Sequence, residues 1–422
     1  MTQPPLRQWL SRSNIYEVNL RQYTAEGTIT AFIPHLPRLK NMGVEILWLM
    51  PVQPIAQKKK KGTMGSPYAC TDYTAINPQL GNLDDFKQLV QETQRLGMKL
   101  IIDWVANHTG WDHRWTTEHK DWYKWDAAKN DFYAAPGMDD IIELNYDNPE
   151  LVQGMIEAMK FWITECGIDG FRCDLASWVR LSFWQAAHRQ LQPVKPLVWL
   201  GEFDAGDHPL YMQVFDTAYT WTWMHRSKEL FDQKAPAQEW KAALQKTLAA
   251  PGLPLWFTTN HDENSWNGTE YEKYGAAASA LAVLSALLPG LPLIYSGQEI
   301  PNHKRLQFFE KDALDWSKGL QLEQFYKTLL ELRRTHPALS GGPAGNFRFI
   351  TTNQEAACMA IERTSGKHRV VAIFNFSEKE QRTRLQGIAT IRTKNVFTGA
   401  EFTLHDGVEV VLPSWGYFAY ST

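Results

Sequence analysis

Four short segments of this 422-residue chain combine carboxylates with arginine, histidine or asparagine at close spacing. They are Asp103–His108, Gly170–Asp174, Gly201–Asp204 and Asn260–Asn264. Each one ends or follows a short apolar run, so its polar side chains belong at the end of a predicted strand. Polar groups are costly to bury without partners, so such a cluster is more typical of a reaction site than of a core. The residue types suit acid–base and nucleophilic chemistry.

Eight apolar, β-rich runs supply the elements that would position these groups. Most are continuous rather than alternating, as expected for parallel strands that are covered on both faces. The predicted strands are Ile15–Asn19, Ile46–Met50, Lys99–Trp104, Ile168–Arg172, Leu197–Glu202, Phe215–Thr220, Leu255–Thr259 and Pro292–Tyr295.

Helical segments lie between the strands. Asn82 is a good N-cap for a helix over Leu83–Leu96, and Asn148 with Pro149 opens another helix that Gly167 ends. Eight parallel strands with crossover helices predict a (β/α)₈ TIM barrel, in which the active site forms at the carboxyl ends of the strands. A doubly wound sheet is the alternative fold, but no glycine-rich phosphate loop follows the first strand.

Two stretches depart from the strand–helix rhythm. Residues 108–146, after the third strand, form a tryptophan-rich insertion that is too long for an ordinary loop. Residues 345–422 contain short alternating runs and predict a C-terminal antiparallel β-sandwich domain. The barrel would then comprise residues 1–107 and 147–344.

Composition excludes several classes of partner. Lys and Arg number 43 against 46 Asp and Glu, so the net charge is -3 and neither nucleic acid nor a membrane is expected as a partner. Residues 1–5 lack the charged start and apolar core of a secretory signal. We therefore expect a cytoplasmic protein, or a secreted or periplasmic one whose signal was removed. The four cysteines are scattered without metal-ligand spacing and are expected to be buried thiols.

The four polar segments resemble, in order, the motifs of the α-amylase family of glycoside hydrolases (family 13). A weaker match lies in the insertion, and another lies before the third strand. The matching stretches are Asp103–His108, Gly170–Asp174, Gly201–Glu202, Asn260–Asp262, Glu143–Pro149 and Ser66–Tyr73. The resemblance covers the whole chain and implies a barrel, a short domain B after the third strand and a C-terminal β domain. It implies an α-glucan or maltooligosaccharide substrate and no organic cofactor.

By this resemblance, Asp174 is the nucleophile, Glu202 the general acid/base and Asp262 the carboxylate that fixes the distorted sugar. The family retains anomeric configuration, which predicts a separation of about 5–5.5 Å between the carboxyls of Asp174 and Glu202. Arg172 is two residues before Asp174 on the same strand face and would hold that carboxylate ionised. We expect a raised pKa for Glu202, because an acid must keep its proton near neutral pH.

Further site residues follow from the same resemblance. His108 and His261 would bind sugar hydroxyls, and Tyr68 would form a stacking platform. Asn107 resembles a calcium ligand where domain B meets the barrel, so a structural Ca²⁺ is possible by analogy. Many α-amylases have a Lys-His pair after the nucleophile; here the two positions are Ser177 and Trp178. We expect Trp178 to contact the sugar beyond the cut.

The leading hypothesis is a retaining hydrolase of α-1,4-glucosidic bonds in starch, glycogen or maltooligosaccharides. A 4-α-glucanotransferase or an exo-acting α-glucosidase or maltodextrinase would share every catalytic residue, whereas an inactive binding protein would lack one of the three carboxylates. The chain has 18 Trp, and at least some of Trp111, Trp178 and Trp266 are expected to line the glucan path. The Lys58–Lys61 run is interpreted as a solvated loop tip.

Overall fold

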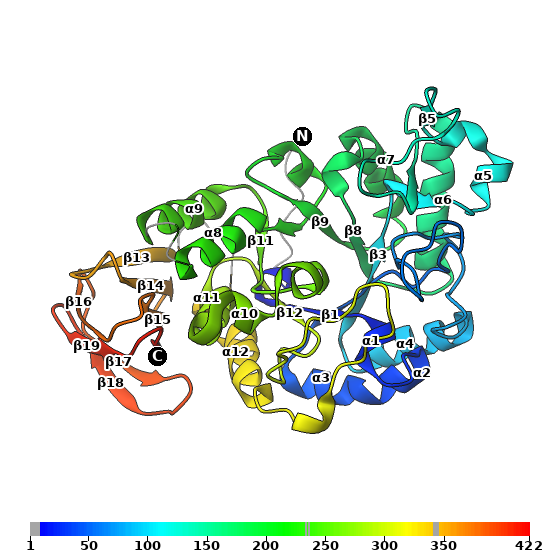
Figure 1. The fold of residues 1–422 in the computed structure, drawn as a ribbon. Coiled ribbons are helices and arrows are strands. Elements are labelled where there is room, and N and C mark those ends of the chain that lie inside the picture. Colours follow the sequence, from blue (N-terminus) through cyan, green and yellow to red (C-terminus); the bar gives the residue numbers. More distant parts are fainter. Residues whose placement is uncertain (1–8, 233, 235–236, 341–345) are drawn as a thin grey trace.

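The protein is described by a computed structural model that covers residues 9–232, 234, 237–340 and 346–422. A closed parallel barrel occupies the centre, an insertion lies at one end, and an antiparallel sheet lies at the other (Figure 1). The predicted barrel with its insertion and C-terminal β domain is therefore confirmed. The N-terminal residues 1–5 and the predicted boundary between 344 and 345 lie outside the described residues, and the exact domain boundaries stay a prediction.

The barrel strands follow the order β1-β12-β11-β10-β9-β8-β3-β2, and every neighbouring pair is parallel. Their bounds are β1 Ile15–Val18, β2 Ile46–Leu49, β3 Lys99–Trp104, β8 Gly170–Cys173, β9 Val198–Asp204, β10 Thr217–Tyr219, β11 Leu253–Trp256 and β12 Leu291–Tyr295. All eight predicted strands are present. The largest shift is in β11, because the apolar run continues through Phe257 after the ladder with β12 has ended at Trp256.

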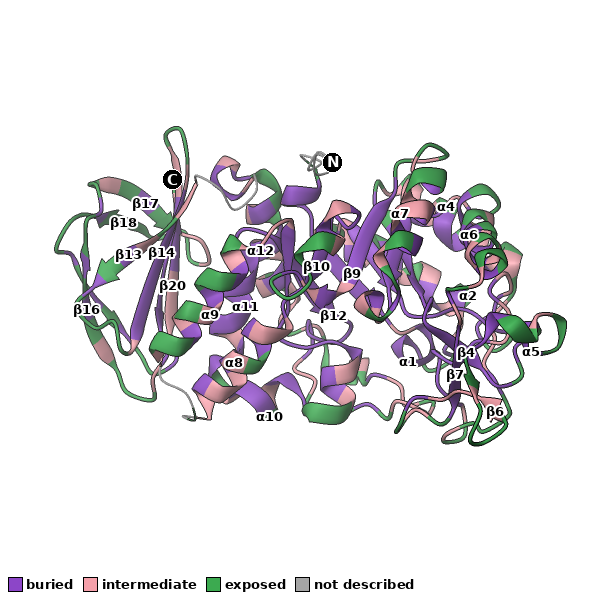
Figure 2. Ribbon diagram, turned by 90° about the horizontal axis from the view of Figure 1, so that it is seen from above, coloured by how far each residue is buried: buried purple, intermediate pink, exposed green. Residues whose placement is uncertain are grey.

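Helices surround the barrel, and most of them expose one face and bury the other (Figure 2). The longer ones are α4 Leu83–Arg95, α6 Pro149–Thr164, α7 Leu181–Leu191, α8 Trp221–Phe231, α9 Ala237–Ala249, α11 Ala278–Leu287 and α12 Glu323–Thr335. The predicted caps are present: the Asn82 side chain accepts hydrogen bonds from the backbone of Asp84 and Asp85, and Asn148 accepts one from Glu150. No described helix is long and apolar enough to cross a bilayer.

The insertion is held together by two-stranded ladders and by packed tryptophans. Strands β4 (His108–Gly110) and β7 (Ile141–Glu143) pair, as do β5 (Trp125–Asp126) and β6 (Asp131–Phe132). The hydroxyl of Tyr73 donates to the backbone oxygens of Val105 and His108, and that of Tyr146 donates to Ala106. These bonds fix the chain as it leaves β3 and enters the insertion.

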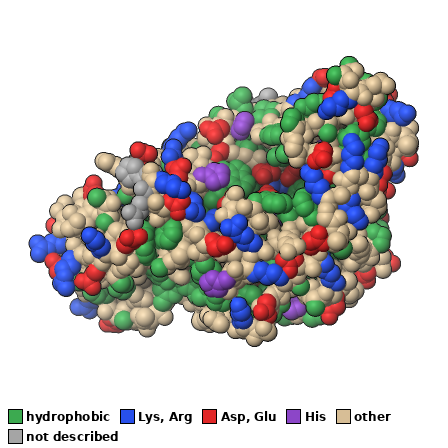
Figure 3. Space-filling view, viewed as in Figure 1, with side chains coloured by type: hydrophobic (Ala, Val, Ile, Leu, Met, Phe, Trp, Pro, Cys, Tyr) green, Lys and Arg blue, Asp and Glu red, His purple; other side chains and the backbone are tan. Residues whose placement is uncertain are grey.

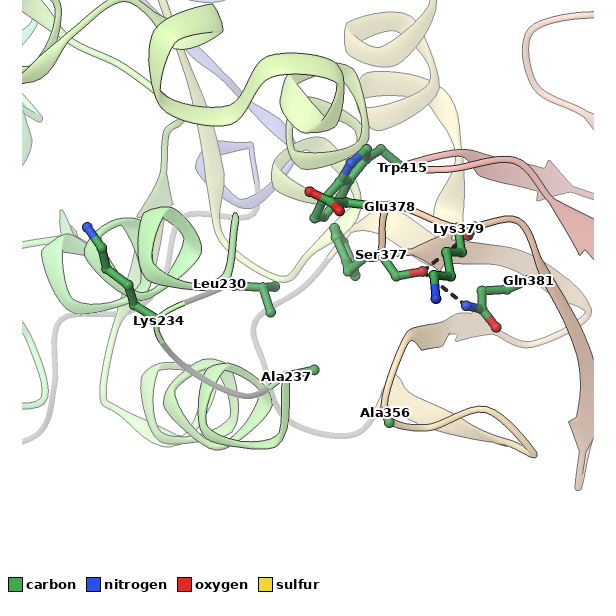
Figure 4. A pocket seen from close by; sticks show the side chains of 10 residues that line it. Leu230, Lys234, Ala237, Ala356, Ser377, Glu378, Lys379, Gln381 and Trp415 are labelled. Atoms are coloured by element: carbon green, nitrogen blue, oxygen red, sulfur yellow. Dashed lines mark hydrogen bonds between the residues drawn. The ribbon is translucent and has the colours of Figure 1, made fainter. Parts of the chain in front are cut away.

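The C-terminal strands form a sheet of order β18-β17-β20-β15-β14-β13-β16-β19. Their bounds are β13 Phe347–Thr352, β14 Cys358–Ser365, β15 His368–Asn375, β16 Gln381–Gln386, β17 Ile391–Asn395, β18 Glu401–Leu404, β19 Glu409–Leu412 and β20 Tyr417–Ser421. One face shares a hydrophobic core with barrel helices; for example, the rings of Trp240 and Phe376 are 4.8 Å apart. A pocket of about 510 Å³ lies along this junction (Figure 4).

Arg333 of α12 closes the amino-terminal end of the barrel. Its guanidinium is fully buried, and burial lowers its pKa to about 9. It donates hydrogen bonds to backbone oxygens that precede β1 and β12, namely those of Ser11, Ser13, Ala286, Leu288 and Gly290. One side chain thus satisfies carbonyls that come from both ends of the barrel sequence.

Candidate active site

Arg172 lies at the centre of the polar cluster and contacts three carboxylates. Its Nη1 atom is 2.8 Å from Asp103 Oδ1 and 2.8 Å from Asp174 Oδ1, and its Nη2 atom is 2.8 Å from Glu202 Oε2. The guanidinium is fully buried. A buried charge is stable only when it is paired, so this arginine fixes both the place and the orientation of the carboxylates around it.

Two of these carboxylates differ in the proton affinity that their surroundings give them. Burial raises the pKa of Glu202 to about 7, with Arg172 opposing the shift and the charges of Asp174 and Asp262 adding to it. Burial likewise raises the pKa of Asp174 to about 6, and Arg172 opposes that shift. The raised pKa of Glu202 leaves this group partly protonated at neutral pH, which suits a general acid, and the contact of Asp174 with Arg172 favours the ionised form of that carboxylate.

A second chain of contacts begins at Glu17 on β1. Its Oε1 atom is 2.5 Å from His261 Nδ1, and the carboxylate is fully buried. His261 Nε2 lies 2.7 Å from the Tyr68 hydroxyl and 3.3 Å from Asp262 Oδ2, and Tyr68 in turn donates to Asp103 Oδ2 over 2.9 Å. Burial lowers the pKa of His261, but Asp262 and Glu17 outweigh it and raise the pKa to about 9.

This network assigns the direction of each bond. The Tyr68 hydroxyl has one proton, which it donates to Asp103, so it accepts from His261 Nε2. His261 also donates from Nδ1 to Glu17, and an imidazole with protons on both nitrogens is the charged form. The geometry and the raised pKa thus agree that His261 is a cation at neutral pH.

His108 and Asn107 lie where β3 leads into the insertion, and both are buried. The Asn107 amide nitrogen is 3.4 Å from His108 Nδ1, and burial lowers the pKa of His108 to about 4, so this imidazole is neutral. Among the described residues, no group of three or more His, Cys, Asp or Glu side chains is placed to hold a metal ion. Because Ca²⁺ also binds amide and backbone oxygens, the calcium ligand expected at Asn107 stays a prediction.

The predicted residues meet in one cleft of about 420 Å³. Figure 3 shows acidic side chains recessed among hydrophobic ones near the middle of this face, by the ends of β8 and β9. The lining includes Tyr68, His108, Asp174, Glu202, His261 and Asp262. It also includes residues that the sequence did not single out, namely Lys61, Gly137, Met138, Asp140, Phe308 and Phe309.

The three tryptophans expected along the glucan path lie in different environments. Trp266 is half exposed and lines the cleft, with its ring 5.3 Å from that of Phe308. Trp178 is also half exposed; it lies in a short 3₁₀ helix, Ala176–Trp178, and does not line this cavity, so its expected contact with the sugar beyond the cut stays a prediction. Trp111 is buried and donates to the backbone oxygen of Asp139, so it packs the insertion.

Glu17 and Asp103 are the main polar residues of the site to which the sequence analysis assigned no role. Asp103 belongs to a matched motif, but the motif does not indicate that Arg172 and Tyr68 are its partners. Glu17 lies inside the predicted apolar strand Ile15–Asn19, and a carboxylate in such a run is itself a signal, because it must find a buried partner at the barrel axis. Tyr219 is a third case, with its hydroxyl accepting from Arg172 Nε over 3.2 Å.

Comparison with known proteins agrees with this arrangement. Residues 11–124 and 118–328 match the family described as "Alpha amylase, catalytic domain". The chain is 26% identical to "Alpha-amylase 3" of Dictyoglomus thermophilum, over 88% of this chain and 86% of that protein. It is 29% identical to "Neopullulanase 2" of Thermoactinomyces vulgaris, over 85% of this chain and 64% of that protein.

A solved structure gives the same result at the level of the fold. The noncanonic maltogenic α-amylase AmyB from Thermotoga neapolitana superimposes with a TM-score of 0.89 at 27% identity, covering 98% of this chain and 99% of that one. The family match, the barrel and the carboxylate cluster agree. This chain belongs to the α-amylase family of glycoside hydrolases, family 13, and is an enzyme that acts on α-glucans.

Proposed function

We propose that the enzyme hydrolyses α-1,4-glucosidic bonds in starch, glycogen or maltooligosaccharides with retention of anomeric configuration. The observation that carries this proposal is the shared guanidinium: Asp174 and Glu202 each lie 2.8 Å from a different terminal nitrogen of Arg172. Two carboxyls held on one guanidinium are close neighbours, which favours a retaining pair over the wider spacing of an inverting one. The α-amylases among the related proteins support the choice of bond.

In the first step, the Asp174 carboxylate attacks the anomeric carbon while the bond to the leaving oxygen breaks. Glu202 transfers its proton to that oxygen, and the sugar remains on Asp174 as an ester. Water then attacks the anomeric carbon, Glu202 takes the proton of the water, and the Asp174 carboxylate is released. Asp262 and the charged His261 border the cleft where sugar hydroxyls would be bound.

Digestion of maltoheptaose by wild type and by Asp174→Asn tests the proposal. We expect shorter oligosaccharides from wild type, first released as the α-anomer by NMR, and at least a thousandfold loss of turnover in the variant. Normal activity of Asp174→Asn would refute the nucleophile assignment. Products longer than seven glucose units would instead indicate a 4-α-glucanotransferase, in which a second sugar replaces water in the second step.

A further inference from the structure

Residues 57–66, which we call the bridge, join the insertion to the loop that follows β12. On the insertion side, the backbone amide of Gln57 donates to Asp112 over 2.9 Å, and Lys59 Nζ lies 3.2 Å from the centroid of the Trp111 ring. Lys61 Nζ is 2.8 Å from Asp140 and 3.1 Å from Asp139. Lys58, Lys59 and Lys60 are exposed, as expected of a solvated loop tip, but Lys59 and Lys61 also have specific partners on the insertion.

The other half of the bridge contacts the loop after β12. The Thr63 amide donates to Glu310 over 2.9 Å, and the Met64 amide donates to the backbone oxygen of Phe309 over 3.0 Å. Gly62 has a φ of +63°, and a Cβ atom there would meet Phe309 Cβ at 2.5 Å. Glycine is thus required both for the left-handed backbone and for this close approach.

The bridge is also tied to the barrel itself. Arg21, just after β1, donates from Nη1 to the backbone oxygen of Gly65 over 3.0 Å in a buried bond. The segment therefore has anchors on the insertion, on the barrel and on the loop after β12. A loop with three such anchors is a fixed wall rather than a swinging tip.

This wall belongs to the cleft already described. Lys61, Phe309, Gly137 and Asp140 line the same cavity as Asp174 and Glu202. The wall comes from loops after β12, β2 and β3. Strands β12 and β2 flank β1, and β3 is the next strand after β2, whereas Glu202 comes from β9 on the other side of the barrel. Aromatic contacts connect Tyr68 to Phe308 at 6.0 Å and Phe308 to Phe309 at 5.1 Å, so the wall begins next to the Tyr68 and Asp262 side of the site.

The position of the wall, opposite Glu202, determines which part of a bound glucan would contact it. Glu202 protonates the oxygen of the leaving group, so the leaving, reducing-end portion lies on the β9 side. The sugars that stay on Asp174 extend in the other direction, toward the bridge. We infer that the bridge closes the cleft to the non-reducing side, so that the enzyme acts at the free non-reducing end of an α-glucan and releases short units. This inference rests on the proposed function.

A pair of substrates tests it directly. One is p-nitrophenyl α-maltoheptaoside, and the other is the same compound with a 4,6-O-ethylidene group on its non-reducing end. An enzyme that needs the free end should cleave the blocked compound at least about tenfold more slowly, as a site that rejects added bulk does. Products are separated by chromatography and detected by the nitrophenyl absorbance.

Two variants locate the cause in the bridge. The double variant Lys61→Ala with Asp112→Ala removes the ion pairs of Lys61 and the bond from Gln57 to Asp112, and leaves the contact of Lys59 with Trp111. It should narrow the difference in cleavage rate between the two substrates. The control Lys60→Ala changes a lysine of the same segment whose Nζ, among the described residues, hydrogen-bonds only to Gln57, at 3.1 Å. It should keep the difference in cleavage rate between the two substrates. Unfolding temperatures show that each variant is folded, and the wild-type comparison stands without them.

The outcomes separate this inference from the proposed function. Equal cleavage of both compounds by wild type, in a manner abolished by Asp174→Asn, would overturn the closed end while the hydrolase proposal stands. Failure to cleave the free heptaoside would overturn both. A large difference in cleavage rate between the free and the blocked heptaoside that persists unchanged in the double variant would show that the bridge does not close the cleft.

Discussion

Replacing Glu17 tests the electrostatics of the site directly, because this carboxylate affects the charge of His261 rather than a bound substrate. Replacing Glu17 by Gln keeps the size of the side chain and an acceptor for His261 Nδ1 but removes the charge. In the wild type the pKa of His261 rises from its ordinary value near 6.5 to about 9. That rise corresponds to about 3 kcal/mol of preference for the charged imidazole, which Asp262 and Glu17 share.

The variant should therefore lower the pKa of His261 by about 1–2 units, since one of two neighbouring carboxylates is lost. The effect on stability has a definite sign. A histidine whose pKa is raised in the folded state stabilises the fold below its unfolded pKa of about 6.5, and this stabilisation is lost as the pH rises through about 9. The wild type should thus have a larger free energy of unfolding than Glu17→Gln. This difference should be greatest near pH 6 and smallest near pH 10.

Histidine-selective ¹⁵N NMR titration measures the pKa, with His261→Gln used to assign the signal. Urea unfolding at pH 6 and pH 10 measures the difference in free energy. Glu270→Gln is a matched control, because Glu270 is also a buried carboxylate but contacts Thr258 and Gln298 instead of His261. An unchanged pKa of His261 in Glu17→Gln, together with a stability difference independent of pH, would refute the reasoning.

Further predictions concern the acid, the cleft and the barrel base. Because the pKa of Glu202 is about 7, kcat/KM should fall about tenfold per pH unit above pH 7, and a profile flat to pH 9 would contradict its role as the acid. Trp266→Ala should raise KM for maltooligosaccharides roughly 5- to 20-fold with a smaller change in kcat, measured by initial rates, because its half-exposed ring borders the cleft, where it can stack on a sugar. Arg333→Leu should lower the free energy of unfolding by about 3 kcal/mol or more in urea titration, since it leaves buried carbonyls without donors; an effect below about 1 kcal/mol would show that water replaces the guanidinium.

Much of the barrel could be predicted because strands buried on both faces leave a strong local pattern. The run Lys99–Trp104, for example, was predicted with the bounds that the structure has. The carboxylates that we propose as catalytic could be located for the same reason: Asp174 and Glu202 stand at or just after the ends of such runs, and parallel strands end on the same face. Local chemistry also predicted both helix caps, at Asn82 and Asn148, because capping depends on residues only two or three positions away.

The rest depends on contacts between residues far apart in the chain. Nothing near Lys61 reveals that Asp140 is its partner, and nothing near Glu17 reveals His261, which lies 244 positions away. The place of Trp178 in the sequence predicts a sugar contact, and that contact stays a prediction, because the ring is half exposed but does not line the cleft of Asp174 and Glu202. Tryptophans in the insertion proved mainly to be packing, since Trp111, Trp115 and Trp122 are buried.

The carbonyl contacts of Arg333 have a consequence for how the chain is made. Arg333 donates to the backbone oxygen of Ser13, which lies 320 positions earlier in the chain. The residues before β1 therefore obtain this donor only after α12, almost the last barrel helix, has been synthesised. Contacts of such long sequence separation form slowly, and at synthesis rates of about 5–20 residues per second the first strand has no closing partner for many seconds. During this interval the apolar edge of β1 is open to other chains. Barrel closure is thus a late step of biogenesis, and shielding of the nascent N-terminal half should govern the yield of native enzyme.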